Sequence, residues 1–209
     1  MLSTLAAGFL TGGSLIVAIG AQNAYVLRQG LLRHHVGAVV LVCAASDAVL
    51  IVAGVAGIGV VVERAGWVID VVRWLGVAFL LWYAAASLRR ALAPESLDAG
   101  AVGAARAEPA RTVVGRAVAL TWLNPHVYLD TVLLIGSIAA THGSTGSGLL
   151  DGRWQFAVGA VLASVAWFSG LGFGARLLAP LLARPRSWQV LELLIAATML
   201  LVAAKLALG

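Results

Sequence analysis

The chain has few of the residues on which soluble and metal-binding proteins depend. Only 11% of its 209 residues are charged and 61% are hydrophobic, which excludes an ordinary soluble domain. The single cysteine, Cys43, lies inside an apolar run, which excludes a disulfide framework and a cysteine-based metal site. His34 and His35 are adjacent and have no third ligand nearby, so we expect no metal site and no cofactor.

The positive charge is divided among short segments rather than gathered on one face. The formal net charge is +5, but this distribution argues against a nucleic-acid-binding surface and is typical of topology signals. Ten of the fourteen basic residues follow the first, third or fifth apolar run: Arg28, Arg33, Arg89, Arg90, Arg106, Arg111, Arg116, Arg176, Arg184 and Arg186. Because positive loops are retained on the cytoplasmic side, the pattern predicts that both termini lie outside.

Six apolar runs are each long enough to cross a bilayer as a helix, which takes about 20 residues. They are Leu5–Leu27, Val36–Val62, Trp67–Leu88, Ala117–Ala140, Trp154–Ala175 and Trp188–Leu208. The sequence therefore predicts an all-α polytopic membrane protein with six transmembrane helices. The first run lacks a basic leader and a small-residue cleavage site, so we expect it to be a retained span.

The longest connection, roughly residues 89–116, is rich in Ala, Gly, Pro and charge. This composition predicts a flexible cytoplasmic linker. It divides a single transporter domain, residues 1–209, into a first half (1–88) and a second half (117–209) of three spans each. Two three-span halves must be inserted in opposite orientations, which predicts two inverted three-helix repeats.

Two of the apolar runs are interrupted by polar residues that disturb a helix. Gly20, Gln22 and Asn23 interrupt the first run, and Asn124 and Pro125 interrupt the fourth. Proline removes a backbone donor and clashes with the preceding turn, which frees carbonyl acceptors. Non-helical backbone at membrane depth is tolerated only against protein or a water-filled cavity, so the two breaks predict a transport site.

Two carboxylates lie deep inside apolar runs, whereas Asp70 and Glu192 lie near the ends of theirs. At 1.5 Å per residue, Asp47 is about 16 Å from the cytoplasmic end of the second span and Asp130 about 20 Å from that of the fourth, so both are predicted near the bilayer midplane. A charged group is costly there, so each predicts a cationic substrate, a coupling proton, or both. The alternative is that each is protonated, hydrogen-bonded to a neighbouring helix and merely structural.

The other polar residues form a second predicted layer. Asn23 and Asn124 are expected closer to the cytoplasm than the aspartates, where they would orient the polar backbone groups of a substrate. His126 precedes Asp130 by four residues and shares its helix face. This pair fits a proton relay and fits an intrahelical hydrogen bond equally well.

Three segments resemble the lysine/arginine exporter (LysE) family, with the arginine-exporting branch closest. They are residues 20–30 (GAQNAYVLRQG), 43–47 (CAASD) and 121–131 (TWLNPHVYLDT). The resemblance implies a six-span bacterial inner-membrane exporter of basic amino acids, driven by the membrane potential or the proton gradient. It implies functional roles for Gln22, Asn23, Asp47, Asn124, Pro125 and Asp130. The family commonly has proline where this chain has Ala21, so whether the first span is kinked is left open, whereas Asn124 and Pro125 keep the prediction of a break in the fourth.

The sequence therefore predicts a secondary active exporter of L-arginine and/or L-lysine. Asp47 and Asp130 would meet the substrate's cation, and one aspartate or His126 would carry the coupling proton. Two membrane aspartates also suit an intramembrane aspartyl protease, although the Gly-x-Gly-Asp signature is missing around both. A regulatory or assembly subunit is a third alternative. The expected partners are the basic amino acid, protons and the lipid bilayer, and a homodimer is left open.

Overall fold

The computed structural model describes residues 2–17, 20–58, 66–92, 108–143, 151–182 and 185–208. Within these residues all regular secondary structure is helical. The elements are α1 (Leu2–Ile16), α2 (Ala21–Leu32), α3 (Val36–Val55), α5 (Gly66–Leu92), α6 (Ala110–Trp122), α7 (Pro125–Val127), η2 (Tyr128–Leu134), α8 (Ile135–Ala140), α9 (Gly152–Gly174), η4 (Ala175–Leu182) and α10 (Pro185–Leu208). The segment η2 is a π-helix and η4 a 3-10 helix.

The helices are long and apolar enough to form six membrane spans. Four are single helices: Val36–Val55, Trp67–Leu92, Gly152–Leu178 and Arg186–Leu208. The other two are bent pairs, α1 with α2 at 85° and α6 with the following α7–η2–α8 segment at 60°. The predicted all-α polytopic membrane fold is confirmed, with each bent pair counted as one span. The inverted repeat and the orientation of the termini stay predictions.

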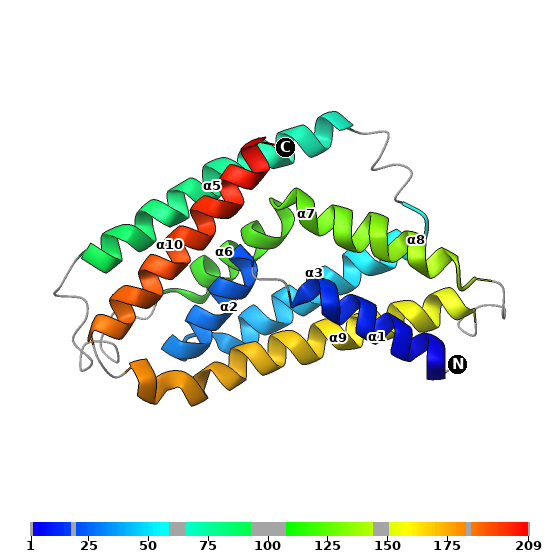
Figure 1. The fold of residues 1–209 in the computed structure, drawn as a ribbon, viewed down its shortest axis with the longest axis horizontal. Helices are drawn as coiled ribbons and strands as arrows, with labels where there is room; N and C mark the ends of the chain where they lie inside the picture. The colour runs from blue at the N-terminus through cyan, green and yellow to red at the C-terminus, as the bar shows by residue number, and fades with distance from the viewer. Residues whose placement is uncertain are drawn as a thin grey trace.

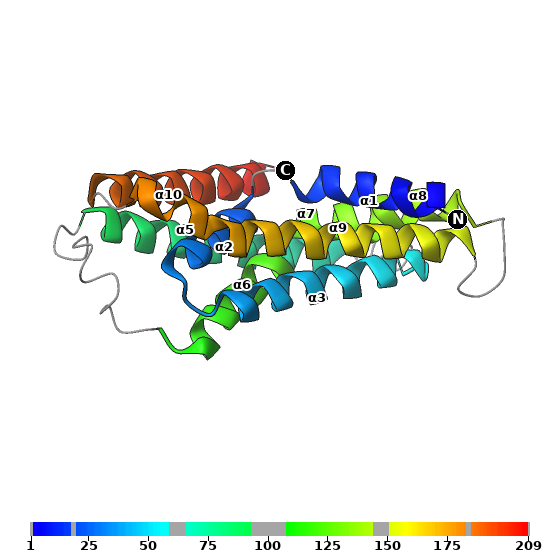
Figure 2. The same cartoon turned by 90° about the horizontal axis from the view of Figure 1, so that it is seen from below.

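The spans are arranged as two helix pairs joined by shorter segments. The helix α5 runs beside α10, and α1 runs beside α9 (Figure 1). On the opposite side of α9 lies α3 (Figure 2), which also packs against α6, η2 and α8. The two pairs converge where α2 and α5 end and α3 and α10 begin, and they diverge toward the other end (Figure 1). We call the convergent end the basic end, since its described residues include Arg33, Arg89, Arg111, Arg176 and Arg186.

The helix α3 touches the second part of the bent fourth span backbone to backbone. A Cβ atom on Gly54 would lie 2.6 Å from the carbonyl oxygen of Val132, and a Cβ atom on Gly136 would lie 2.7 Å from the carbonyl oxygen of Gly54. Neither contact leaves room for a side chain. Glycine at these two positions is therefore what lets the spans approach so closely.

Several predicted boundaries differ from the structure. The helix α3 ends at Val55 rather than at Val62, because the chain turns there and Gly57 takes a left-handed conformation with φ 91°. Both α5 and α6 extend into the predicted linker of residues 89–116. Residues 93–107 lie outside the described part of the chain, and the division into two halves stays a prediction.

Candidate functional site

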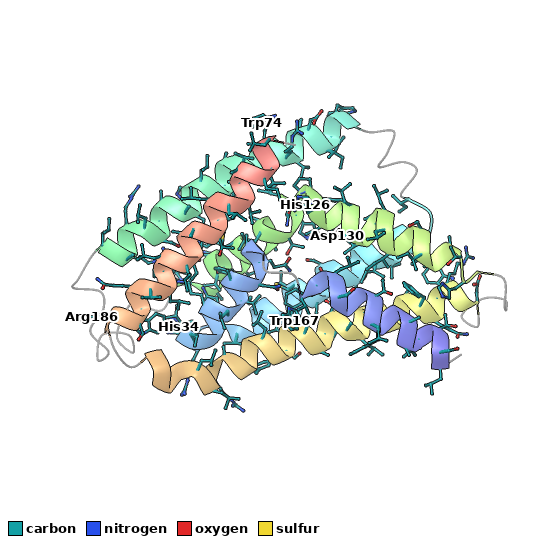
Figure 3. The ribbon with its side chains drawn as sticks, viewed as in Figure 1. His34, Trp74, His126, Asp130, Trp167 and Arg186 are labelled. Carbon is teal, nitrogen blue, oxygen red and sulfur yellow. The ribbon has the colours of Figure 1, made fainter. Side chains whose placement is uncertain are left out.

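The first break separates α1 from α2. Gly20 is extended, with φ −136° and ψ 174°, and directly precedes α2. Asn23 Nδ2 donates a hydrogen bond to the carbonyl oxygen of Ile16 at 2.8 Å, and Trp167 Nε1 donates to Asn23 Oδ1 at 3.2 Å. Asn23 therefore ties the end of α1 to both α2 and α9. Figure 3 labels Trp167 on α9 near this point.

The bend at the first break is the larger of the two, at 85° against 60°. The first span is therefore strongly bent, although Ala21 stands where the family commonly has proline. The physical reason is the amide of Asn23, which satisfies a carbonyl group left unpaired at the end of α1. A side chain that pairs this carbonyl stabilises the broken helix without a proline.

The second break separates α6 from α7. Asn124 caps α7 by accepting a hydrogen bond at Oδ1 from the backbone N–H of His126 at 3.1 Å, and Pro125 is the first residue of α7. Proline is favoured at this position because its missing N–H has no helical acceptor there. Tyr128 Oη donates to the carbonyl oxygen of Trp122 at 2.9 Å. As at the first break, a side chain pairs a carbonyl at the interrupted helix end.

We expect Tyr128→Phe to destabilise the protein by about 1 kcal/mol, because it leaves the partly buried Trp122 carbonyl without this donor. Thermal unfolding of the purified protein in detergent measures the change. Ser137→Ala is the matched control, since the exposed Ser137 hydroxyl donates only to the Leu134 carbonyl of the same span. Equal melting temperatures for the two variants would show that Tyr128 does not brace the break.

The two breaks face one small pocket between α2, α5, α6 and α10. Its lining includes Ala21, Gly76, Phe79, Leu123, Asn124 and Val202. Asn124 supplies the one polar side chain among the residues that line it. A Cβ atom on Gly76 would collide with the Leu123 carbonyl oxygen, so α5 lies directly against the second break. The structure thus brings together two segments that are about a hundred positions apart in the sequence.

Asp47 is buried in the middle of α3 with 4% of its surface exposed. Its Oδ2 accepts a hydrogen bond from Ser164 Oγ of α9 at 2.7 Å. Among the described residues it forms no ion pair. A buried carboxylate held by a hydroxyl and lacking a protein cation keeps its capacity to bind a cation or a proton.

Asp130 lies in η2 and is half-buried. It also forms no ion pair in the described part of the chain, although His126 and Lys205 are close enough to act on it electrostatically. Figure 3 labels His126 and Asp130 on the same bent segment. The π-helical turn that holds Asp130 alters the α-helical spacing on which the predicted shared face depended. Such turns are frequent at functional sites.

The helix α3 contacts the fourth span at two levels, one near each aspartate. Ser46, beside Asp47, accepts a hydrogen bond from Trp122 Nε1 at 3.1 Å. Gly54, which lies about 10 Å farther along α3, contacts η2 next to Asp130. The common depth of the two aspartates in the membrane stays a prediction. The helix α6 begins at Ala110, seven residues before the predicted start of the fourth span.

Gln22 adds an unused hydrogen-bond donor beside the first break. Its Nε2 atom is buried and, among the described residues, has no hydrogen-bond partner of standard geometry, although the side chain lies beside the Cys43 thiol. Gln22 is adjacent to Ala21, which lines the pocket. Of the polar residues singled out from the sequence, Asn23 and Asn124 are engaged in holding the breaks, whereas this Gln22 donor is unpaired.

A buried charge network was missed by the sequence analysis. Glu192 of α10 forms ion pairs with Arg28 of α2 at 2.7 Å and with Arg90 of α5 at 3.1 Å. Depth counting placed Arg28 in a loop and Glu192 near a span end. A lone glutamate inside an apolar run was the signal that could have found it.

Comparison with known proteins identifies close similarities over nearly the whole chain. The profile of the family described as "LysE type translocator" matches residues 13–209. The chain is 37% identical over 226 residues to a Corynebacterium efficiens protein named lysine exporter LysE, covering 96% of each. It is 38% identical over 231 residues to the Corynebacterium diphtheriae protein of the same name, covering 98% of this chain and 99% of that one.

An arginine exporter is equally similar. The chain is 41% identical over 207 residues to the Yersinia enterocolitica protein named arginine exporter protein ArgO, covering 99% of this chain and 97% of that one. No solved structure matches the chain.

Proposed function

Because the chain belongs to the LysE family, we propose that it exports basic amino acids, L-arginine and/or L-lysine, across the bacterial inner membrane. Export is driven by the proton gradient or the membrane potential. The family and the exporters among its relatives make the chain a multi-pass membrane transporter and not an enzyme. The protease alternative also fits the geometry poorly, because an aspartyl protease needs two adjacent carboxylates.

The observation that carries the proposal is a buried aspartate without a cation. Asp47 is satisfied only in part by Ser164, and η2, which carries Asp130, contacts α3 at Gly54, about 10 Å along α3 from Asp47. A basic amino acid carries a cationic group at each end. One aspartate for each cation is compatible with this arrangement, and it replaces the sequence-based idea that both meet one cation.

The polar residues around the breaks have supporting roles in this proposal. Gln22 offers its buried amide donor, and Asn124 faces the pocket where the breaks meet. Asn23 and Pro125 maintain the interrupted backbone at that pocket. Proton coupling would use Asp47, or Asp130 together with His126.

Counterflow in proteoliposomes tests the proposal. We expect vesicles loaded with unlabelled arginine to accumulate external labelled arginine, with lysine competing and citrulline, which has an uncharged side chain, failing to compete. Equal competition by citrulline would contradict selection by charge. Absence of any exchange by the purified protein would favour the assembly-subunit alternative. Collapsing the proton gradient and the membrane potential separately identifies the driving force.

A further inference from the structure

Near the basic end of the bundle, the carboxylate of Glu192 links three helices through two arginines. Glu192 Oε1 accepts hydrogen bonds from Arg28 Nε at 2.7 Å and from Arg90 Nε at 3.1 Å, while Oε2 accepts from Arg90 Nη2 at 3.1 Å. The exposed fractions of the Glu192 and Arg28 side chains are 5% and 10%. Three helices, α2, α5 and α10, are thus joined at one point, where Glu192 and Arg28 are buried and the Arg90 side chain is 30% exposed.

The network has unused capacity for an anion. Two guanidinium groups face one carboxylate, which leaves an excess of one positive charge. Beside them lies Tyr83, which is 1% exposed and whose hydroxyl has no hydrogen-bond partner among the described residues. The Arg90 guanidinium carbon is 5.6 Å from the centre of the Tyr83 ring. Arg28 and Glu192 are also close enough to act on Tyr83 electrostatically. A buried donor without an acceptor is costly, and a carboxylate would supply the acceptor.

The same three helices also line the pocket at the breaks. Arg28 follows the pocket residue Ala21 by seven positions on α2, and Tyr83 follows Gly76 by seven on α5, which is about 10 Å in each helix. The network therefore lies between the pocket and the basic end, which the sequence predicts to be cytoplasmic. A substrate that moves from that end to the pocket along these helices must pass it.

Opening the network requires a replacement for each charge. Separating a buried ion pair leaves uncompensated charges, which is strongly unfavourable. A basic amino acid carries both replacements, because its side-chain cation can occupy Glu192 while its carboxylate binds the arginines. For arginine, the incoming guanidinium is the same chemical group as that of Arg28.

We propose that this network is a first binding site for the exported amino acid at the basic end. Glu192 binds the side-chain cation, and Arg28, Arg90 and the Tyr83 hydroxyl bind the carboxylate. The substrate's cation would replace Arg28 on the Glu192 carboxylate, which Arg28 contacts at 2.7 Å. This assignment rests on the proposed function for its substrate class.

Tyr83→Phe gives the cleanest test, since it removes a hydroxyl that bonds to nothing in the closed network. A purely structural role therefore leaves the melting temperature unchanged or raised and the transport constants unaltered. The proposal expects the KM for arginine to rise about tenfold, as for loss of a hydrogen bond to a charged group. The maximal rate stays unchanged. Uptake into inside-out vesicles, which expose the predicted cytoplasmic end, measures both constants.

Two further experiments distinguish substrate binding at the network from a purely structural role. Agmatine, which lacks the carboxylate, should inhibit uptake weakly and equally in wild type and Tyr83→Phe. The double variant Arg28→Gln/Glu192→Gln, which leaves no carboxylate at this point, should raise the KM for arginine as well. An unchanged KM in Tyr83→Phe overturns the assignment, and so does a Tyr83-dependent stabilisation by anionic lipid with unchanged KM. If wild type takes up no arginine, the proposed function itself fails.

Discussion

Arginine export should fall roughly 100-fold or more when Asp47 is replaced by asparagine. Asparagine keeps the size of the side chain and an oxygen that can accept from Ser164, so the packing of α3 on α9 is retained. The substitution removes the negative charge that would pair with the substrate's cation. Loss of one partner of a buried ion pair costs about 3 kcal/mol or more, which corresponds to a fall in export rate of this size. Initial rates in proteoliposomes, normalised to the amount of inserted protein, measure the effect.

Asp70→Asn is the matched control for this experiment. Asp70 forms an exposed ion pair with Arg73 at 3.1 Å, with 61% of its side chain accessible, and we expect its replacement to leave the rate unchanged. Asp130→Asn should also lower export, because Asp130 would hold the other cation. Wild-type export by Asp47→Asn would contradict charge pairing as the mechanism.

A second large effect is expected at the contact between α3 and the fourth span. Gly54→Ala places a methyl group 2.6 Å from the Val132 carbonyl oxygen and 2.8 Å from that of Thr131. Neither is a flexible side chain, so the two spans must move apart. We expect destabilisation of about 1–3 kcal/mol, together with reduced export, because η2 carries Asp130.

Gly37→Ala is the control on the same helix. A Cβ atom on Gly37 meets nothing within 4 Å, and alanine favours the helix more than glycine does. Its melting temperature should therefore equal or exceed that of wild type. Melting temperatures of Gly54→Ala and Gly37→Ala in the same detergent measure this difference in stability. Equal values would mean that α3 and η2 are not packed as closely as described.

Much of the fold could be predicted from local sequence. Apolar runs separated by arginines predict spans, and the residues at Gly20 and Pro125 predict where two of them break. Local sequence could not predict the size of the first bend, which depends on the hydrogen bond of Asn23 to a carbonyl seven residues away. The pairing of Arg28 with Glu192 joins residues 164 positions apart, and no helical periodicity reveals such a pair.

The candidate site was predictable in its members but not in its arrangement. Asp47 and the asparagines stand out because polar groups are rare in these apolar runs. Their expected depths depend on where each helix begins, and α6 begins at Ala110, seven residues before the start that the apolar run predicts. The roles of Asn23 and Asn124 in holding the breaks could be seen only from their partners in space.

The π-helical turn of η2 has a geometric consequence for Asp130. It accommodates one residue more than an α-helical turn does, and one residue corresponds to about 100° of rotation around a helix axis. Beyond the turn, Gly136 is fixed against Gly54. At its start, Tyr128 bonds to Trp122, and before it Asn124 caps α7. The π-helical turn thus holds one extra residue between two ends that are fixed by contacts. Redistributing it would turn the Asp130 carboxylate toward a different neighbour while both anchors stay in place.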